Sequence, residues 1–127
     1  MSDLRQPAIR VTMMPRDTNH HGTIFGGVLL SYIDQAGAVA ASLHTRRKLV
    51  TVAMREVVFH EPVKVGDLVS FYGEIARIGN TSVTVKVTVV AERLLEPGQV
   101  SIEVTEAEVV YVAVDDEGHP IPFSQGP

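Results

Sequence analysis

The segment 17–34, DTNHHGTIFGGVLLSYID, places polar residues, two adjacent glycines and an acid at the start of an apolar stretch. At a helix N-terminus the first backbone N–H groups have no partner within the helix, and the helix dipole adds partial positive charge there. Gly26 and Gly27 have no Cβ, so a ligand oxygen could approach those N–H groups closely. The pair is therefore a candidate pocket for a carbonyl or oxyanion, although close packing of a helix on a sheet would also explain two glycines.

Asp34 follows within the same predicted helix. The residues three and four positions away are Leu30, Ser31, Gly37 and Ala38, so its carboxylate lies on a face of small and apolar groups. An ionised group loses several kcal/mol of solvation on burial, and a role in an active site is a common reason to accept that loss. We therefore interpret Asp34 as a candidate general base; the alternative is a helix face that simply reaches solvent.

The other polar candidates are an asparagine and the histidines. Asn19 lies in the turn before the helix, where its amide could hold a water or a substrate carbonyl, or could only form the turn. The histidines are His20, His21, His44, His60 and His119. No two of them have the i, i+4 spacing of a helical zinc motif, and no cysteine assists them, so no metal site is predicted.

The composition indicates one globular domain over residues 1–127. The chain is 45% hydrophobic, which is enough to form a core, and its net charge of −4 lacks the basic surface of a nucleic-acid-binding protein. It has no Cys, which excludes disulfides and thiolate chemistry. No apolar stretch reaches the roughly 20 residues of a membrane span, and the N-terminus does not resemble a signal peptide. We expect a cytoplasmic protein without nucleic-acid or membrane partners.

Hydrophobic periodicity predicts one helix and five strands, with an ordered core over about residues 9–122. The helix covers about residues 25–44, and the strands cover residues 9–14, 49–59, 68–78, 83–92 and 100–114. The last four strands are expected to form an antiparallel meander. Apolar residues fall on every face of the helix, so it should be surrounded by protein. One five-stranded sheet cannot easily cover every side, which predicts that a second subunit completes the burial.

The segment that contains the glycine pair and the acid resembles the acyl-CoA thioesterase family of the hotdog fold, in the branch of short bacterial YciA-like hydrolases. The family pattern is Asp-Thr-Asn, two variable positions, Gly, then Phe-Gly-Gly and an acid in the helix. The matching residues are Asp17, Thr18, Asn19, Gly22, Phe25, Gly26, Gly27 and Asp34. Supporting matches are VTVAMREVVFHEPVKVGDLV, IGNTSVTVKV and VVYVAVDDEGHPIP, and the resemblance covers about residues 9–122.

The resemblance implies an α+β hotdog fold, with a five-stranded antiparallel sheet wrapped around one long central helix. It implies an acyl-CoA thioester hydrolase that releases a free fatty acid and CoA. It also implies a dimer with a continuous sheet and a homohexamer built as a trimer of dimers. In this arrangement Asp34 is the general base or nucleophile, Asn19 comes from the neighbouring subunit, and the Gly27 amide polarises the thioester carbonyl. Phe25 and Gly26 would border the substrate.

Coenzyme A is part of the substrate in this interpretation, so no separate cofactor is expected. The resemblance places the nucleotide part of the coenzyme near Arg77 and the turn residues Gly79, Thr81 and Ser82. Because the protein as a whole is acidic, the phosphates must find their partners in a limited pool of basic side chains. That pool is Arg46, Arg47, Lys48, Arg77, Lys86 and Arg93.

Two other functions on the same fold stay open at the level of sequence. A non-catalytic acyl-CoA-binding or sensing module would need a partner domain or a ligand-driven switch, and we expect no appended DNA-binding segment in this chain. A hotdog dehydratase would be expected to use a His as its base, and no His occupies the helix face that carries Asp34. Release of free thiol from an acyl-CoA distinguishes hydrolysis from both.

Overall fold

The helix and the five strands follow one another in the predicted order, in a computed structural model that describes residues 5–94, 96–98 and 100–124. The elements are β1 (Ile9–Thr12), the short 3-10 helix η1 (Pro15–Asp17), α1 (Gly26–Ser42), β2 (Lys48–Arg55), β3 (Leu68–Ile78), β4 (Ser82–Arg93) and β5 (Val100–Val114). The predicted bounds of β3 and β5 agree with the structure, whereas α1 and β2 end earlier than predicted. No helix among the described residues is long and apolar enough to cross a membrane.

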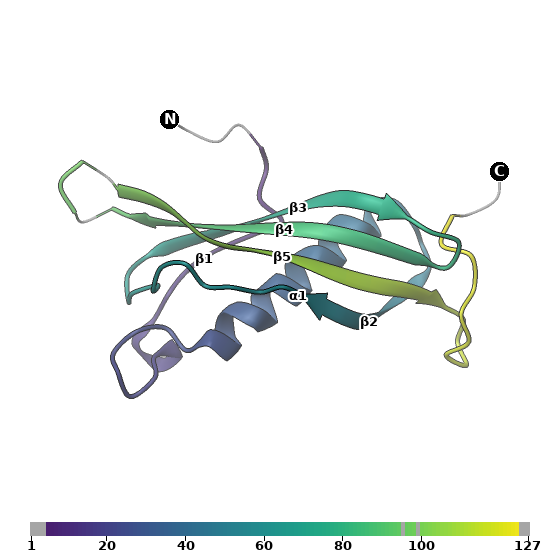
Figure 1. Cartoon of the computed structure of the whole chain (residues 1–127), viewed down its shortest axis with the longest axis horizontal. Coiled ribbons are helices and arrows are strands. Elements are labelled where there is room, and N and C mark those ends of the chain that lie inside the picture. The colour runs from purple at the N-terminus through teal and green to yellow at the C-terminus, as the bar shows by residue number, and fades with distance from the viewer. Residues whose placement is uncertain (1–4, 95, 99, 125–127) are drawn as a thin grey trace.

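All five strands join one antiparallel sheet in the order β1, β3, β4, β5, β2. The predicted meander is present in β3, β4 and β5. It was wrong for β2, which pairs with β5 at the far edge of the sheet and not with β3 (Figure 1). Short turns join neighbouring strands, whereas the connection 56–67 is long enough to let β2 and β3 occupy separate places in the sheet.

The inner face of the sheet packs against α1, which lies across it (Figure 1). The alternating valines of β4 face the helix and are fully buried: Val83, Val85, Val87 and Val89. The helix approaches β3 closely at Gly73, where an added Cβ would lie 2.6 Å from the Cβ of Ala40. Small residues at this crossing therefore set the distance between helix and sheet.

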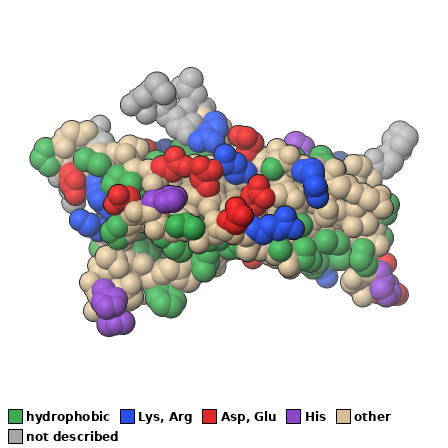
Figure 2. All heavy atoms as spheres, in the orientation of Figure 1, with side chains coloured by type: hydrophobic (Ala, Val, Ile, Leu, Met, Phe, Trp, Pro, Cys, Tyr) green, Lys and Arg blue, Asp and Glu red, His purple; other side chains and the backbone are tan. Residues whose placement is uncertain are grey.

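The opposite side of α1 is not covered within one chain. Gly27, Ser31 and Gln35 are exposed, and Val39 is 43% exposed. The sheet of one chain therefore packs against only one face of the helix, which agrees with the prediction that one sheet cannot cover every side. Figure 2 shows hydrophobic side chains along the lower side of the molecule, where Figure 1 places α1 and β2.

The edge strand β2 also presents apolar side chains to solvent. Val50 is 38% exposed and Val52 is 56% exposed. The register with β5 shifts between Thr51 and Ala53, so Val52 forms a bulge. An exposed apolar edge strand is a template for pairing with another chain. The uncovered side of α1 and the open edge of β2 are thus where a second subunit would bury most apolar surface.

Candidate active site

Asp34 lies near the middle of α1 on the side that faces the edge strand β2. Its side chain is partly buried, and the hydroxyl of Thr51 on β2 donates a hydrogen bond of 2.7 Å to Asp34 Oδ1. The second carboxylate oxygen, Oδ2, accepts no hydrogen bond from the described residues. The structure therefore fixes the orientation of this carboxylate and leaves one oxygen for a water or a substrate.

A second side chain holds the backbone of the same residue. The hydroxyl of Tyr111 on β5 donates a hydrogen bond of 2.6 Å to the backbone carbonyl of Asp34. Gly37 makes this contact possible, because a Cβ at that position would overlap with the Tyr111 oxygen. The sequence pointed to none of Thr51, Tyr111 and Gly37. The only local signal was a glycine inside a helix, which often marks a close approach.

The predicted glycine pair opens α1, with Phe25 as its N-cap. Among the described residues nothing accepts a hydrogen bond from the backbone N–H groups of Gly26 and Gly27, so both are available to a ligand oxygen. The ring of Phe25 lies against Gly27, where an added Cβ would be 2.7 Å from ring carbon Cε2. The absence of side chains therefore provides both open amides and room for the aromatic ring.

An open cavity of about 530 Å³ runs along the uncovered side of α1. Its lining residues are Phe25, Gly27, Val28, Ser31, Tyr32 and Gln35. Most of this lining is apolar or small, and the polar groups Ser31 and Gln35 are joined by a hydrogen bond of 3.1 Å. The cavity follows the helix from the open amides towards the level of Asp34, and its outer wall is missing in a single chain.

Asn19 does not meet Asp34 within one chain. Its side-chain oxygen accepts hydrogen bonds from the backbone N–H groups of His21 at 2.9 Å and Thr23 at 3.3 Å, and its amide donates to the Thr23 hydroxyl at 3.2 Å. Within one chain Asn19 therefore stabilises its own turn, which is the turn-forming alternative. Asp34 lies about 12 Å along the helix axis from Gly26, while Asn19 precedes the helix.

The predicted coenzyme turn lies at the other end of the molecule, where α1 ends and β2 begins (Figure 1). Gly79 donates its backbone N–H to the Ser82 carbonyl at 2.8 Å, and Thr81 accepts from the backbone of Ala113 at 2.8 Å. The neighbouring Asn80 carbonyl accepts from the buried Phe123, also at 2.8 Å. The turn is therefore held by the C-terminal segment, and the structure does not bring it to Asp34.

The six basic residues of this pool fall into two groups, those that form ion pairs with other described residues and those that do not. Arg93 is 12% exposed, forms an ion pair of 3.3 Å with Asp67 and donates to the Pro62 carbonyl at 2.6 Å. Lys86 forms an ion pair of 3.1 Å with Glu106. Among the described residues Arg46, Arg47, Lys48 and Arg77 form no ion pair, and all four belong to the end of the fold that carries the turn at 79–82. The basic side chains of this pool that form no ion pair therefore gather at that end.

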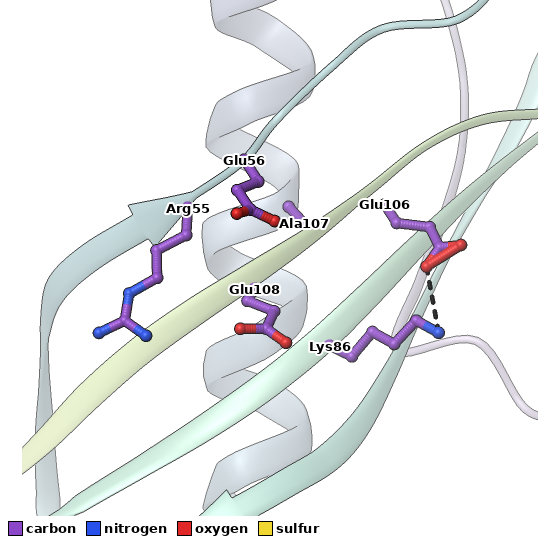
Figure 3. A pocket seen from close by; sticks show the side chains of 6 residues that line it. All are labelled: Arg55, Glu56, Lys86, Glu106, Ala107 and Glu108. Carbon is purple, nitrogen blue, oxygen red and sulfur yellow. Dashed lines mark ion pairs between the residues drawn. The ribbon is translucent and has the colours of Figure 1, made fainter.

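The surroundings of Lys86 are unsuited to a phosphate. Lys86 lines a shallow pocket of about 260 Å³ that has three carboxylates in its lining. Figure 3 shows these side chains on the face of the sheet that is turned away from α1. Those acids are Glu56, Glu106 and Glu108, and the only other cation there is Arg55. The hydrogen bond from Lys86 lowers the pKa of Glu106, so the pair stays charged at neutral pH. Negative charge in excess would repel an anionic ligand.

Comparison with known proteins identifies the family. The chain matches the family model described as the thioesterase superfamily over residues 21–97, more than half of its length. The acyl-CoA thioester hydrolase YciA of Escherichia coli is 41% identical over 113 residues, which cover 88% of this chain and 86% of that protein.

Solved structures support the same assignment. A hexameric hotdog-fold thioesterase of Campylobacter jejuni has a TM-score of 0.89 at 44% identity, covering 97% of this chain and 93% of that chain. A hexameric broad-specificity acyl-coenzyme A thioesterase has a TM-score of 0.88 at 32% identity, covering 98% of this chain and 85% of that chain. The predicted α+β hotdog fold is confirmed. The chain therefore belongs to the hotdog-fold thioesterase superfamily, in the group of the YciA acyl-CoA thioester hydrolases.

Proposed function

We propose that this protein hydrolyses acyl-CoA thioesters to a free fatty acid and coenzyme A. The observation that carries the proposal is the carboxylate of Asp34, which Thr51 orients beside the uncovered side of α1. The open amides of Gly26 and Gly27 and the largely apolar cavity lie on the same helix. The relatives named above, which match nearly the whole chain, are acyl-CoA thioester hydrolases and thioesterases.

The proposed chemistry uses Asp34 and the helix N-terminus. A thioester carbonyl is already activated, so an aligned water and a polarised carbonyl suffice without a metal or a separate cofactor. As a general base, Asp34 Oδ2 takes a proton from water while the water oxygen bonds to the thioester carbon. The Gly27 amide stabilises the oxyanion, and the carbon–sulfur bond then breaks to release the CoA thiolate, which takes up a proton. As a nucleophile, the same oxygen would attack the carbon and expel the CoA thiolate, forming a mixed anhydride that water then hydrolyses to the free acid and the regenerated Asp34 carboxylate.

The proposed assembly completes the site. Two chains pair through the β2 edges and the uncovered sides of α1, and three such dimers form a hexamer. The two solved structures named above are described as hexameric, which supports a six-chain assembly. In the dimer, Asn19 of one chain contributes to the site that contains Asp34 of the other. The cavity along α1 then receives its outer wall from the partner and holds the acyl chain, and Phe25 and Gly26 border the substrate.

The nucleotide part of the coenzyme is proposed to bind at the far end of α1. Gly79, Thr81 and Ser82 form a turn that the C-terminal segment holds in place. Arg77 and the basic residues at 46–48 supply positive charge around this turn. Arg93 and Lys86 are not part of this proposal, because they already form ion pairs with Asp67 and Glu106. We propose the cytoplasm as the site of this activity.

Thr51→Val is expected to lower kcat about tenfold, because the carboxylate of Asp34 loses the hydrogen bond that fixes its orientation. Valine keeps the shape and strand preference of threonine, so the sheet should be retained. The measurement is the rate of thiol release at saturating acyl-CoA. The matched control is Thr88→Val on β4, which removes a hydroxyl at a position that does not contact Asp34. Equal rates for the Thr51→Val variant and the wild type would remove Thr51 from the mechanism.

The experiment that tests the proposed function is a panel of saturated acyl-CoAs of increasing chain length, assayed for release of free thiol. Hydrolysis predicts catalytic release with at least one of them and an optimum length set by the cavity. Saturable binding of every acyl-CoA without thiol release would contradict the proposal and favour a sensor. Conversion of an enoyl-CoA or hydroxyacyl-CoA with the thioester intact would instead identify a dehydratase.

A further inference from the structure

We propose that Tyr111 is a positioning residue that holds the helix backbone at the catalytic carboxylate, an inference that rests on the function proposed for Asp34. Tyr111 lies on β5, and its side chain reaches α1 and donates its hydroxyl proton to the backbone carbonyl of Asp34 at 2.6 Å. In a regular α-helix that carbonyl also accepts a hydrogen bond from the backbone N–H of Ala38.

The phenol hydroxyl therefore adds a hydrogen bond from the sheet to one backbone carbonyl of the helix. The helix is continuous from Gly26 to Ser42, so this bond ties its backbone to β5 at the turn that begins with Asp34. The contact thus sets the position from which the carboxylate leaves the helix. No other backbone carbonyl of α1 in the described residues accepts a hydrogen bond from a side chain of the sheet.

The absence of a side chain at Gly37 leaves room for the Tyr111 hydroxyl. An added Cβ at Gly37 would overlap with the Tyr111 oxygen and would lie 3.1 Å from ring atoms Cε2 and Cζ. Glycine costs a helix interior about 1 kcal/mol relative to alanine, so its presence at a buried position calls for a close contact. Tyr111 and Gly37 thus form a matched pair at the Asp34 turn.

The hydroxyl remains a proton donor throughout the working pH range. Tyr111 is 1% exposed. Its burial, and then the nearby charge of Asp34, raise the pKa of Tyr111 well above the ordinary range. Burial of a polar atom without a partner would be costly, and the bond to the Asp34 carbonyl satisfies it. The role of this group is therefore to hold position, since it does not titrate near neutral pH.

Two neighbouring residues of the sheet hold Asp34, one by its side chain and the other by its backbone. Thr51 and Tyr111 are direct neighbours across β2 and β5. Thr51 binds the side chain of Asp34, and Tyr111 binds its backbone. The edge strand β2 and its neighbour β5 therefore locate the carboxylate relative to the sheet and to the surface where the partner chain would pack.

The test is Tyr111→Phe, which removes the hydroxyl and keeps the buried ring. We expect kcat for thiol release to fall about tenfold while KM stays within about twofold, because binding surfaces are unchanged and the reacting group is displaced. The matched control, Tyr72→Phe, removes a hydroxyl from a buried tyrosine of β3 that forms no hydrogen bond with α1 among the described residues, and should keep the wild-type kcat. Wild-type kcat in the Tyr111→Phe variant would overturn the proposal.

A double-mutant cycle separates positioning from ordinary core packing. If Tyr111 acts through Asp34, adding Tyr111→Phe to Asp34→Asn lowers the residual rate no further. An equal loss in both backgrounds would overturn the proposal. As a second variant, Gly37→Ala keeps Tyr111 but displaces its hydroxyl, and should lower kcat at least as much as Tyr111→Phe does. If Asp34→Asn alone retains wild-type turnover, the proposed catalytic role of Asp34 fails, which is a distinct result from additive losses.

Discussion

Asp34→Asn is expected to lower kcat for thioester hydrolysis by at least about a hundredfold, the usual scale for loss of a general base. Asparagine has nearly the shape of aspartate, and its side-chain oxygen can still accept the hydrogen bond from Thr51. It cannot take a proton from water, and it is a poor nucleophile. The backbone contact with Tyr111 is unaffected, so the fold and the assembly should be retained.

The measurement is thiol release from the best acyl-CoA of the chain-length panel, together with KM and the oligomeric state. Asp116→Asn is the matched control, because it removes the same charge from an exposed turn near the end of β5. That variant should keep the wild-type rate. Near-normal turnover in the Asp34→Asn variant would exclude Asp34 from the chemistry, and loss of the oligomer would show that the substitution acts through structure.

The regular elements were predictable because their signals are local. Alternating valines in β4 predicted one buried face, and turn residues bounded β3 and β5. The end of β2 was missed because it depends on one backbone angle. Glu56 has a φ of 53°, in the left-handed region that favours glycine, and it ends the strand at Arg55. The segment beyond it runs beside β5, where Val58 accepts a hydrogen bond from Thr105.

The placement of β2 and the exposure of α1 depend on long-range packing. An apolar pattern around the whole helix indicates how much surface needs burial, but it does not say whether the same chain or a second chain provides the cover. In this structure the sheet covers one face, and the exposed Val39 and Phe25 lie on the other. The uncovered face agrees with the prediction from the sequence that one five-stranded sheet cannot cover every side of the helix.

Some residues of the candidate site could likewise be predicted from the local sequence, and others could not. Asp34 and the glycine pair could be singled out because an acid and adjacent glycines are unusual in an apolar helix. Thr51 and Tyr111 could not, because they contact Asp34 from positions 17 and 77 residues away in the chain. Their contacts exist only because β2 and β5 pair in one register, and a shift of β2 by one residue would turn Thr51 to the other face of the sheet.

The fold determines which of the basic residues stay available to bind a phosphate. Six lysines and arginines were equivalent as phosphate partners in the sequence. The structure uses Arg93 to hold the connection before β3, through Asp67 and Pro62, and surrounds Lys86 with acids. The remaining four belong to the end of the fold that carries the turn at 79–82. Which side chains are committed to ion pairs follows from tertiary contacts and not from the residue type.

Co-expression of two inactive variants is expected to restore thioesterase activity if each site draws Asp34 and Asn19 from different chains. Asn19→Ala alone should lower the rate at least about tenfold, because its amide no longer positions water or substrate. A mixed dimer of an Asp34→Asn chain and an Asn19→Ala chain would have one site that lacks both groups and one intact site. Random pairing in equal amounts then gives about a quarter of the wild-type activity per site.

Different affinity tags on the two variants, purified in sequence, would isolate the mixed assemblies, in which thiol release is then measured. The control pairs an Asp34→Asn chain with a chain that carries both substitutions, and it should show no recovery, because no arrangement of these chains restores an intact site. Asn19 bonds its own turn through His21 and Thr23, so each variant must also show wild-type assembly size. Absence of recovery in verified mixed assemblies would mean that Asn19 and Asp34 serve no common site, and that the asparagine only shapes the turn in which it lies.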